Sequence, residues 1–245
     1  MKKQSNTWLV SLIVFVVWMV IVFGGELLAV GGDPTGLDAM VQSQIVPALV
    51  IAPIFLFIVV AYFNRWQESG LKWVDNNRSL LLLWLPALAI IINLALGLPA
   101  NTTGGRVLLI VLVNTLLVGI SEELMFRGIL LHGARSRYRF WAAILIVSIL
   151  FGLIHTLNGF ITGEFGVALF QSVTAFSSGL MYMGLRLRQN SLLPVMLIHG
   201  LWDFSLFSAG QATMAIALVS IAFVIIFFFY GLWLLRGYRH AETVG

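Results

Sequence analysis

The sequence predicts an all-α protein, a polytopic transmembrane helical bundle of about eight spans with both termini on the cytoplasmic side. Of the 245 residues, 60% are hydrophobic and 10% are charged. Soluble domains contain roughly 45–50% apolar and about 25% charged residues, so too few polar side chains remain to cover a surface in water. The apolar residues also form long continuous runs, and the basic residues collect between alternate runs. At ~20 residues per span, the length accommodates a single membrane domain over residues 1–245.

Each predicted span is an apolar run that ends at polar residues, glycine or proline. Continuous runs favour helices over the alternating pattern of a membrane β-barrel. The first run continues as far as Val30, which is longer than the apolar region of a signal peptide, so we interpret it as a retained span. The expected spans are approximately 8–30, 44–63, 79–98, 107–134, 140–158, 165–185, 191–207 and 212–235.

Lysine and arginine provide an independent test of this topology. Twelve of the 14 precede the first span, lie in alternate loops or follow the last span, and this pattern places both termini in the cytoplasm. The intervening loops contain a single basic residue, Arg106. The net charge of +4 therefore reflects topology, and no nucleic-acid partner is expected. The twelve residues are Lys2, Lys3, Arg65, Lys72, Arg78, Arg135, Arg137, Arg139, Arg186, Arg188, Arg236 and Arg239. We expect an integral membrane protein of the plasma membrane, with the lipid bilayer as a partner.

Six ionisable side chains interrupt the later predicted spans. Charged groups at this depth are costly unless they pair with one another or face a polar cavity, so they are candidates for a functional site. Glu26 lies close to the outer end of the first span and is expected to be an interfacial charge. The six are Glu122, Glu123 and Arg127 in 107–134, His155 in 140–158, and His199 and Asp203 in 191–207.

Helical geometry sorts the first three of these groups. Glu123 and Arg127 are four residues apart, so they lie on one helix face and can pair, whereas Glu122 lies about 100° around the helix and is free of that pair. An α-helix rises ~1.5 Å per residue. Measured from the cytoplasmic ends of their spans, the depths of Glu122, His155 and Asp203 are then about 20, 24 and 18 Å. The groups are therefore expected to converge near the middle of the bilayer.

The same four-residue spacing relates Phe151 to His155 and His199 to Asp203. Two imidazoles and a carboxylate can hold a divalent metal such as zinc, or a polarised water molecule. The chain has no cysteine, so a thiolate metal site is excluded. Glu122 is the candidate general base, and the residues available as metal ligands are His155, His199, Glu122 and Asp203.

Other interpretations of the buried polar groups remain open. The carboxylates and imidazoles could form the relay of a proton- or cation-coupled transporter, although no inverted repeat is evident in the sequence. A non-catalytic immunity or scaffolding membrane protein is a further alternative. For Asn93, Asn114 and Gln171 we expect hydrogen bonds between helices, and Asn114 could line the same cavity as Glu122.

The three motifs resemble those of a known family when they are taken in order. Glu122-Glu123-x-x-x-Arg127, Phe151-x-x-x-His155 and His199-x-x-x-Asp203 are similar to the motifs of the CPBP family of intramembrane metalloproteases. This family includes the type II CAAX prenyl endopeptidases and the bacteriocin-processing and immunity proteins. The resemblance covers about residues 118–205, and we expect a family-like catalytic core over about 105–207.

The resemblance implies a hydrolase, a membrane-embedded peptidase that depends on glutamate and acts as a metalloprotease. Its substrate would be a peptide or a prenylated protein, membrane-associated or of the CAAX type. Glu122 would activate water that His155 and His199 hold, with or without a metal. Such proteins often have asparagine where this sequence has Asp203, and the aspartate favours a role as metal ligand, or a protonated carboxyl, over a neutral oxyanion donor. Glu123 completes the catalytic set, and Arg127 and Phe151 support it.

Overall fold

The computed structural model describes residues 2–30, 36–63, 66–208 and 214–240, and every regular element in these ranges is a helix. The predicted all-α fold is thus confirmed for the part of the chain that the structure describes. Arg65, one of the basic residues that predicted the topology, lies outside these ranges.

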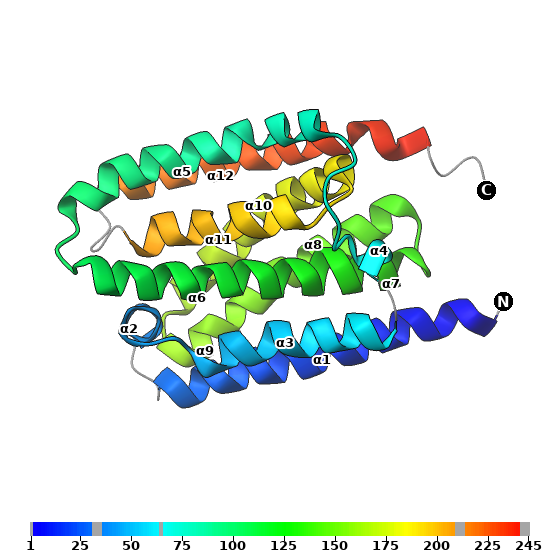
Figure 1. Cartoon of the computed structure of the whole chain (residues 1–245), viewed down its shortest axis with the longest axis horizontal. Coiled ribbons are helices and arrows are strands. Elements are labelled where there is room, and N and C mark those ends of the chain that lie inside the picture. The colour runs from blue at the N-terminus through cyan, green and yellow to red at the C-terminus, as the bar shows by residue number, and fades with distance from the viewer. Residues whose placement is uncertain (1, 31–35, 64–65, 209–213, 241–245) are drawn as a thin grey trace.

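The long helices run back and forth along one common axis (Figure 1). Each predicted span is helical over most of its length, and the short helices α2 and α4 in the connections are additional. The elements are α1 (Lys2–Val30), α2 (Gly36–Ser43), α3 (Pro47–Tyr62), α4 (Trp66–Ser69), η1 (Asn77–Leu83), α5 (Trp84–Gly97), η2 (Leu98–Ala100), α6 (Gly105–Glu123), η3 (Leu124–Leu130), α7 (Leu131–Arg135), α8 (Phe140–Ile154), η4 (His155–Leu157), α9 (Asn158–Thr162), α10 (Phe165–Gln189), α11 (Leu193–Phe207), α12 (Met214–Leu235) and η5 (Arg236–His240).

Five helical stretches in the described residues are long and apolar enough to cross a membrane. α3 and α11 are apolar but have only 16 and 15 residues, and a helix needs about 20 residues to cross the hydrocarbon core without tilt. The number of eight spans therefore stays a prediction. The five stretches are Thr7–Val30, Asn77–Gly97, Gly105–Arg135, Phe140–Thr162 and Ile216–Tyr238.

The two ends of the bundle differ in the connections that they carry. Helix α1 begins and α12 ends at the same end, and the connections 70–76, 136–139 and 190–192 lie there too (Figure 1). Helix α2 and the connection 101–104 lie at the opposite end. This arrangement agrees with the alternation of basic loops in the sequence. Helix geometry does not say which end faces the cytoplasm, so the orientation of the termini also stays a prediction.

Helix α8 ends earlier than the predicted span 140–158. It stops at Ile154, a 3₁₀ turn follows over residues 155–157, and the chain resumes as α9. At this cap the backbone N–H bonds to the carbonyls of Gly152 and Leu153, while the Phe151 carbonyl is occupied by the His155 imidazole. A side chain that takes the i−4 carbonyl competes with the helical ladder, which explains the break.

Polar side chains within the bundle join neighbouring helices, as the sequence predicted. Asn93 donates to Ser205 at 3.4 Å and links α5 to α11. Asn114 of α6 donates to two backbone carbonyls at the α2 end of the bundle, at 2.9 and 2.8 Å. Gln171 of α10 accepts a hydrogen bond from Asn158 of α9 at 2.9 Å. The same Asn114 lines the cavity that contains Glu122.

Candidate active site

The site is built on the crossing of α6 and α11, where two glycines let the backbones touch. A Cβ added to Gly119 would lie 2.6 Å from a carbonyl oxygen of α11, and one added to Gly200 would lie 2.8 Å from the Cα of Leu116. Real side chains do not approach so closely, so only glycine permits this packing, which is the small-residue contact typical of membrane helices. The contact sets Glu122, one turn beyond Gly119, beside His199.

Behind this crossing lies a fully buried ion pair. Glu123 ends α6, and its Oε1 accepts a hydrogen bond from Nη1 of Arg127 at 2.9 Å, with neither side chain exposed. Nη2 of Arg127 donates to the Gly179 carbonyl at 3.2 Å, and the guanidinium lies 4.0 Å from the ring centroid of Phe151. The predicted pairing is confirmed. Arg127 belongs to a π-helix, Leu124–Leu130, a rare form that occurs often at functional sites.

The imidazole of His199 connects this ion pair to the front of the site. Its Nδ1 lies 2.8 Å from the Glu123 oxygen that also holds the guanidinium, so the ring donates from Nδ1. Its Nε2 lies 3.7 Å from Oε2 of Glu122 and 3.5 Å from Oδ2 of Asp203. The ring of Tyr182 stacks on the imidazole at 4.8 Å. His199 is thereby fixed on one side and faces two carboxylates on the other.

His155 is oriented by its own helix. Its Nδ1 lies 2.8 Å from the carbonyl oxygen of Phe151. A carbonyl only accepts, so Nδ1 carries the proton and Nε2 of the neutral ring presents a lone pair. The Phe151 ring also meets the imidazole edge-to-face at 5.1 Å. The motif Phe151-x-x-x-His155 therefore sets both the rotation and the tautomer of the histidine.

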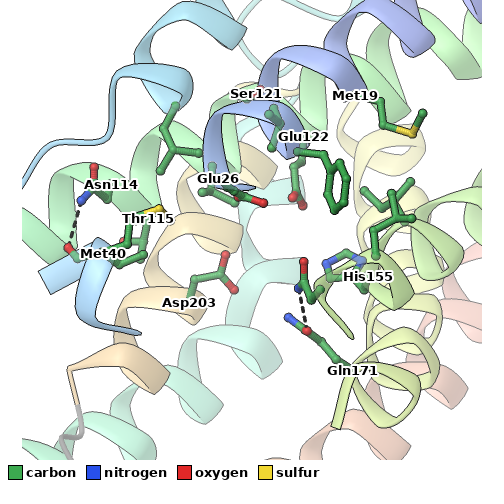
Figure 2. Close-up of a pocket in the computed structure, with 18 of the residues that line it drawn as sticks. Met19, Glu26, Met40, Asn114, Thr115, Ser121, Glu122, His155, Gln171 and Asp203 are labelled. Atoms are coloured by element: carbon green, nitrogen blue, oxygen red, sulfur yellow. Dashed lines mark hydrogen bonds between the residues drawn. The ribbon is translucent and has the colours of Figure 1, made fainter. Parts of the chain in front are cut away.

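Four of the five catalytic candidates share one cavity of about 170 Å³. Glu122, His155, His199 and Asp203 all line it, and Figure 2 shows Glu122 and Asp203 turned toward the same space as His155. Oε2 of Glu122 is buried and accepts no hydrogen bond from the described side chains. A buried carboxylate oxygen normally has a partner. The Glu122 side chain as a whole keeps 13% of its surface exposed and lines the cavity, so its carboxyl group can meet a water molecule there.

A second cavity, of about 280 Å³, meets the first at the histidines. It lies between α8, α10, α11 and α12 and shares His155, His199, Asp203 and Gln171 with the first. Glu122 lines only the first cavity. An extended chain that crossed from one cavity to the other would therefore pass the imidazoles and Asp203.

The candidate residues from the sequence divide into two groups in the structure. Glu123 and Arg127 line neither cavity and lie behind His199, whereas Phe151 lines the second cavity. Glu26, expected to be an interfacial charge, instead lines the first cavity (Figure 2). At ~1.5 Å per residue, Glu26 lies about 27 Å along the helix from residue 8, the start of the predicted first span. This depth is similar to those counted for the other acids, so the same count could have grouped Glu26 with them.

The divalent-metal site that the sequence suggested stays a prediction. Within the described ranges no three His, Asp or Glu side chains form a group that could hold a metal ion. His199 has one nitrogen bound to Glu123, and its other nitrogen faces Glu122 and Asp203 at more than hydrogen-bond length. No step proposed below passes through zinc or another metal.

Comparison with known proteins gives one match. Residues 104–205 match the model of a protein family described as type II CAAX prenyl endopeptidase Rce1-like. The matched stretch begins just before α6 and ends within α11, so it contains all three motifs and every residue of the ion pair and of the catalytic candidates. No curated protein matches the chain. The match confirms the resemblance carried by the motifs, and over residues 104–205 the chain is similar to the Rce1-like type II CAAX prenyl endopeptidases.

Proposed function

We propose that the chain is an intramembrane endopeptidase that hydrolyses a peptide bond of a membrane-associated protein, with CAAX-type proteins as the first candidates. The observation that carries the proposal is the carboxyl group of Glu122, which lines the first cavity and has its Oε2 3.7 Å from Nε2 of His199. A carboxylate and an imidazole on the wall of one cavity can both hydrogen-bond to a single water molecule inside it. The family supports peptidase activity independently.

The proposed reaction uses Glu122 twice. Its carboxylate takes a proton from the water while the water oxygen attacks the scissile carbonyl carbon, and the carbonyl π pair moves to oxygen. The tetrahedral intermediate then collapses, the C–N bond breaks, and the leaving nitrogen takes the proton from the carboxyl of Glu122. The products are a carboxylic acid and an amine, and Glu122 is again ionised. His155 and His199 position the water, because their Nε2 atoms are the ends that the Nδ1 hydrogen bonds leave available.

The remaining acids have different roles in this scheme. Glu123 and Arg127 act through His199, whose ring they hold by the 2.8 Å contact with Nδ1. Asp203 faces the same Nε2 at 3.5 Å and helps to orient the ring and the water. The two cavities supply room for the peptide on either side of the scissile bond.

Cleavage of a reporter peptide library by the purified protein in detergent tests this function. Glu122→Gln should lower kcat by about 10²–10⁴-fold, the range for loss of a general base. Glu164→Gln is the matched control, because Glu164 is an exposed acid directly before α10 that lines neither cavity. Full activity in Glu122→Gln would refute the proposal. Proton or cation flux in liposomes without cleavage would establish the transporter instead, and an inert protein would favour the scaffolding role.

A metal requirement is tested in the same preparation. The proposed mechanism predicts that activity survives a chelator and that zinc does not copurify in stoichiometric amount. Stoichiometric zinc that is lost in His155→Ala together with activity would replace the proposed mechanism with a metal-assisted one.

We further propose eight spans, cytoplasmic termini and residence in the plasma membrane. The helices over each predicted span and the shared end of α1 and α12 support this topology. The natural absence of cysteine makes a labelling test direct. A membrane-impermeant thiol reagent on intact cells should label Thr103→Cys and not Asn77→Cys, and the reverse pattern would invert the topology.

A further inference from the structure

Hydrolysis of an amide by the proposed route places negative charge on the former carbonyl oxygen. Hydrogen-bond donors aimed at this oxyanion usually supply a large part of the rate acceleration. The groups around Nε2 of His199 do not suit this task, since Glu122 and Asp203 are both acids. A neutral N–H donor elsewhere on the cavity wall would complete the site.

Most donors on the wall of the first cavity already have partners. The amide of Asn114 donates to two backbone carbonyls. The hydroxyl of Thr115 donates to the carbonyl of Leu112 at 3.2 Å. The indole of Trp18 donates to Ser121 at 2.7 Å. The amide of Asn114 and the indole of Trp18 hold helices together, and the Thr115 hydroxyl bonds within α6, so none of these groups is available to a substrate without breaking an existing hydrogen bond.

Gln171 is arranged differently. It lies in the first half of α10 and lines both cavities, beside His155, His199 and Asp203 in each. Its Oε1 accepts from Nδ2 of Asn158 at 2.9 Å, so the amide group is turned and its NH₂ end is left for the cavity. Figure 2 shows this nitrogen on the side of Gln171 that faces Asp203, across the cavity from Glu122.

The position of Asn158 follows from the break in α8. Asn158 is the first residue of α9, directly after the 3₁₀ turn that starts at His155. One local distortion of the chain therefore sets the imidazole and the residue that orients Gln171. A continuous helix over 140–158 would present Asn158 differently, because each residue of an α-helix is rotated by about 100° from the last.

We propose that Gln171 donates a hydrogen bond from Nε2 to the oxyanion of the tetrahedral intermediate, and that Asn158 is the positioning residue that turns the amide for this purpose. The inference rests on the proposed peptidase function and adds a catalytic residue outside the three motifs. Glu122 and the water then lie on one side of the scissile carbonyl, and the donor lies on the other. The two cavities meet at this point, so a bound peptide would carry its carbonyl past Gln171.

Kinetics of four variants test the inference. Gln171→Ala should lower kcat by about 10²–10³-fold, the range for removal of one oxyanion donor, with little change in KM. Gln171→Glu should lose at least as much, because it presents a carboxylate to the oxyanion. Asn158→Asp replaces the amide donor with a carboxylate, which accepts a hydrogen bond. This carboxylate should draw the Gln171 NH₂ away from the cavity and reduce kcat as strongly as Gln171→Ala does. Asn158→Ala leaves the amide free to rotate and should cost less.

The ranking of the Asn158 variants separates positioning from a structural role. A merely structural contact would make Asn158→Ala as damaging as Asn158→Asp and would lower the midpoint of thermal unfolding in both. Ser177→Ala is the matched control on the same helix, since Ser177 is buried, bonds to the Val173 carbonyl and lines neither cavity. Its kcat should equal that of the wild type.

Failure of the inference can be told apart from failure of the proposed function. If Glu122→Gln abolishes cleavage while the Gln171 variants keep wild-type kcat, the chain is a peptidase with another oxyanion donor. Tyr182 is then the next candidate, because its buried hydroxyl has no partner among the described residues and its ring lines the second cavity. A large loss of kcat in Tyr182→Phe alone would overturn the role of Gln171. A wild type that cleaves no peptide would overturn both proposals.

Discussion

The two sides of His199 are built on opposite physical principles. Behind the ring lies what we term the ion-pair support, formed by Glu123, Arg127 and Phe151, which is buried and closely packed. In front of the ring lies the cavity face, formed by Glu122, His155, Asp203 and Gln171, where side chains line open space and Oε2 of Glu122 has no partner. Glu122 and Glu123 are neighbours in sequence, yet one side chain is committed to structure and the other is available for chemistry.

This difference teaches that a charge in a membrane domain acquires its role from its neighbours. A buried ion pair is costly to break because the remaining charge has no water to solvate it. An acid on a cavity wall has room for a water molecule or a substrate. Substitutions in the ion-pair support should therefore lower stability first, and substitutions in the cavity face should lower activity first.

The largest effect is expected for Glu122→Gln on activity alone. We expect kcat to fall by about 10²–10⁴-fold, since the amide cannot accept a proton from water. The midpoint of thermal unfolding, followed by circular dichroism in detergent, should hardly change, because Glu122 lines a cavity and its contact with His199 is long, at 3.7 Å. A strong loss of stability in this variant would contradict the separation of the two sides.

The second largest effect is expected on the stability of the protein, from substitutions in the ion-pair support. Arg127→Met should reduce the free energy of unfolding by about 3–5 kcal/mol, because Glu123 is left buried without its cation. Glu123→Gln should act similarly. The double variant should lose less than the sum of the two, since no charge then remains to be desolvated. Strict additivity, measured by denaturation in detergent, would show that the two groups do not act as a pair.

A smaller effect is expected where the two sides are joined, at the α6–α11 crossing. Gly200→Ala adds a Cβ 2.8 Å from the Cα of Leu116, so the helices must separate slightly. Overpacking of this kind costs about 1–3 kcal/mol. The shift also moves His199 away from Glu122. We therefore expect a loss of kcat beyond any that the lower stability causes, by up to about 10²-fold. Unchanged kcat at reduced stability would mean that the crossing does not set the geometry of the site.

The smallest effect is expected outside the membrane-spanning helices. Asp75 accepts from Lys72 and from Asn190, each at 2.7 Å, and ties two connections together. The hydrogen bond from Lys72 and then that from Asn190 lower the pKa of Asp75 below its ordinary value of 3.8. A lowered pKa stabilises the fold above pH 3.8, and the effect is lost as the pH falls through the folded-state value.

Asp75→Asn should therefore be slightly less stable than the wild type at neutral pH. The difference should close below pH 3.8, and kcat should be unaffected because Asp75 lines neither cavity. Thermal unfolding of both proteins across this pH range measures the effect. A difference that grows as the pH falls would contradict the assigned cause of the shifted pKa.

The amino-acid sequence by itself determined the class of the protein and the pairing of one buried acid with one buried base. A composition too apolar for water leaves helices in a bilayer as the solution, because every backbone polar group must bond within its own segment. The four-residue spacing of Glu123 and Arg127 fixed their pairing, because that spacing places two side chains on one face. These conclusions depend only on local geometry and on the solvent.

Only the tertiary structure decided which groups face the cavity. Glu26 and Gln171 lie outside the three motifs, and they join Glu122 because α1 and α10 pack against the same space. The break of α8 at Ile154 was also outside the reach of the apolar pattern, since it depends on how one imidazole bonds to one carbonyl. The side of His199 on which each acid lies is set by a contact of Gly119 and Gly200 between helices about 80 residues apart, and spacing along a single helix cannot report such a contact.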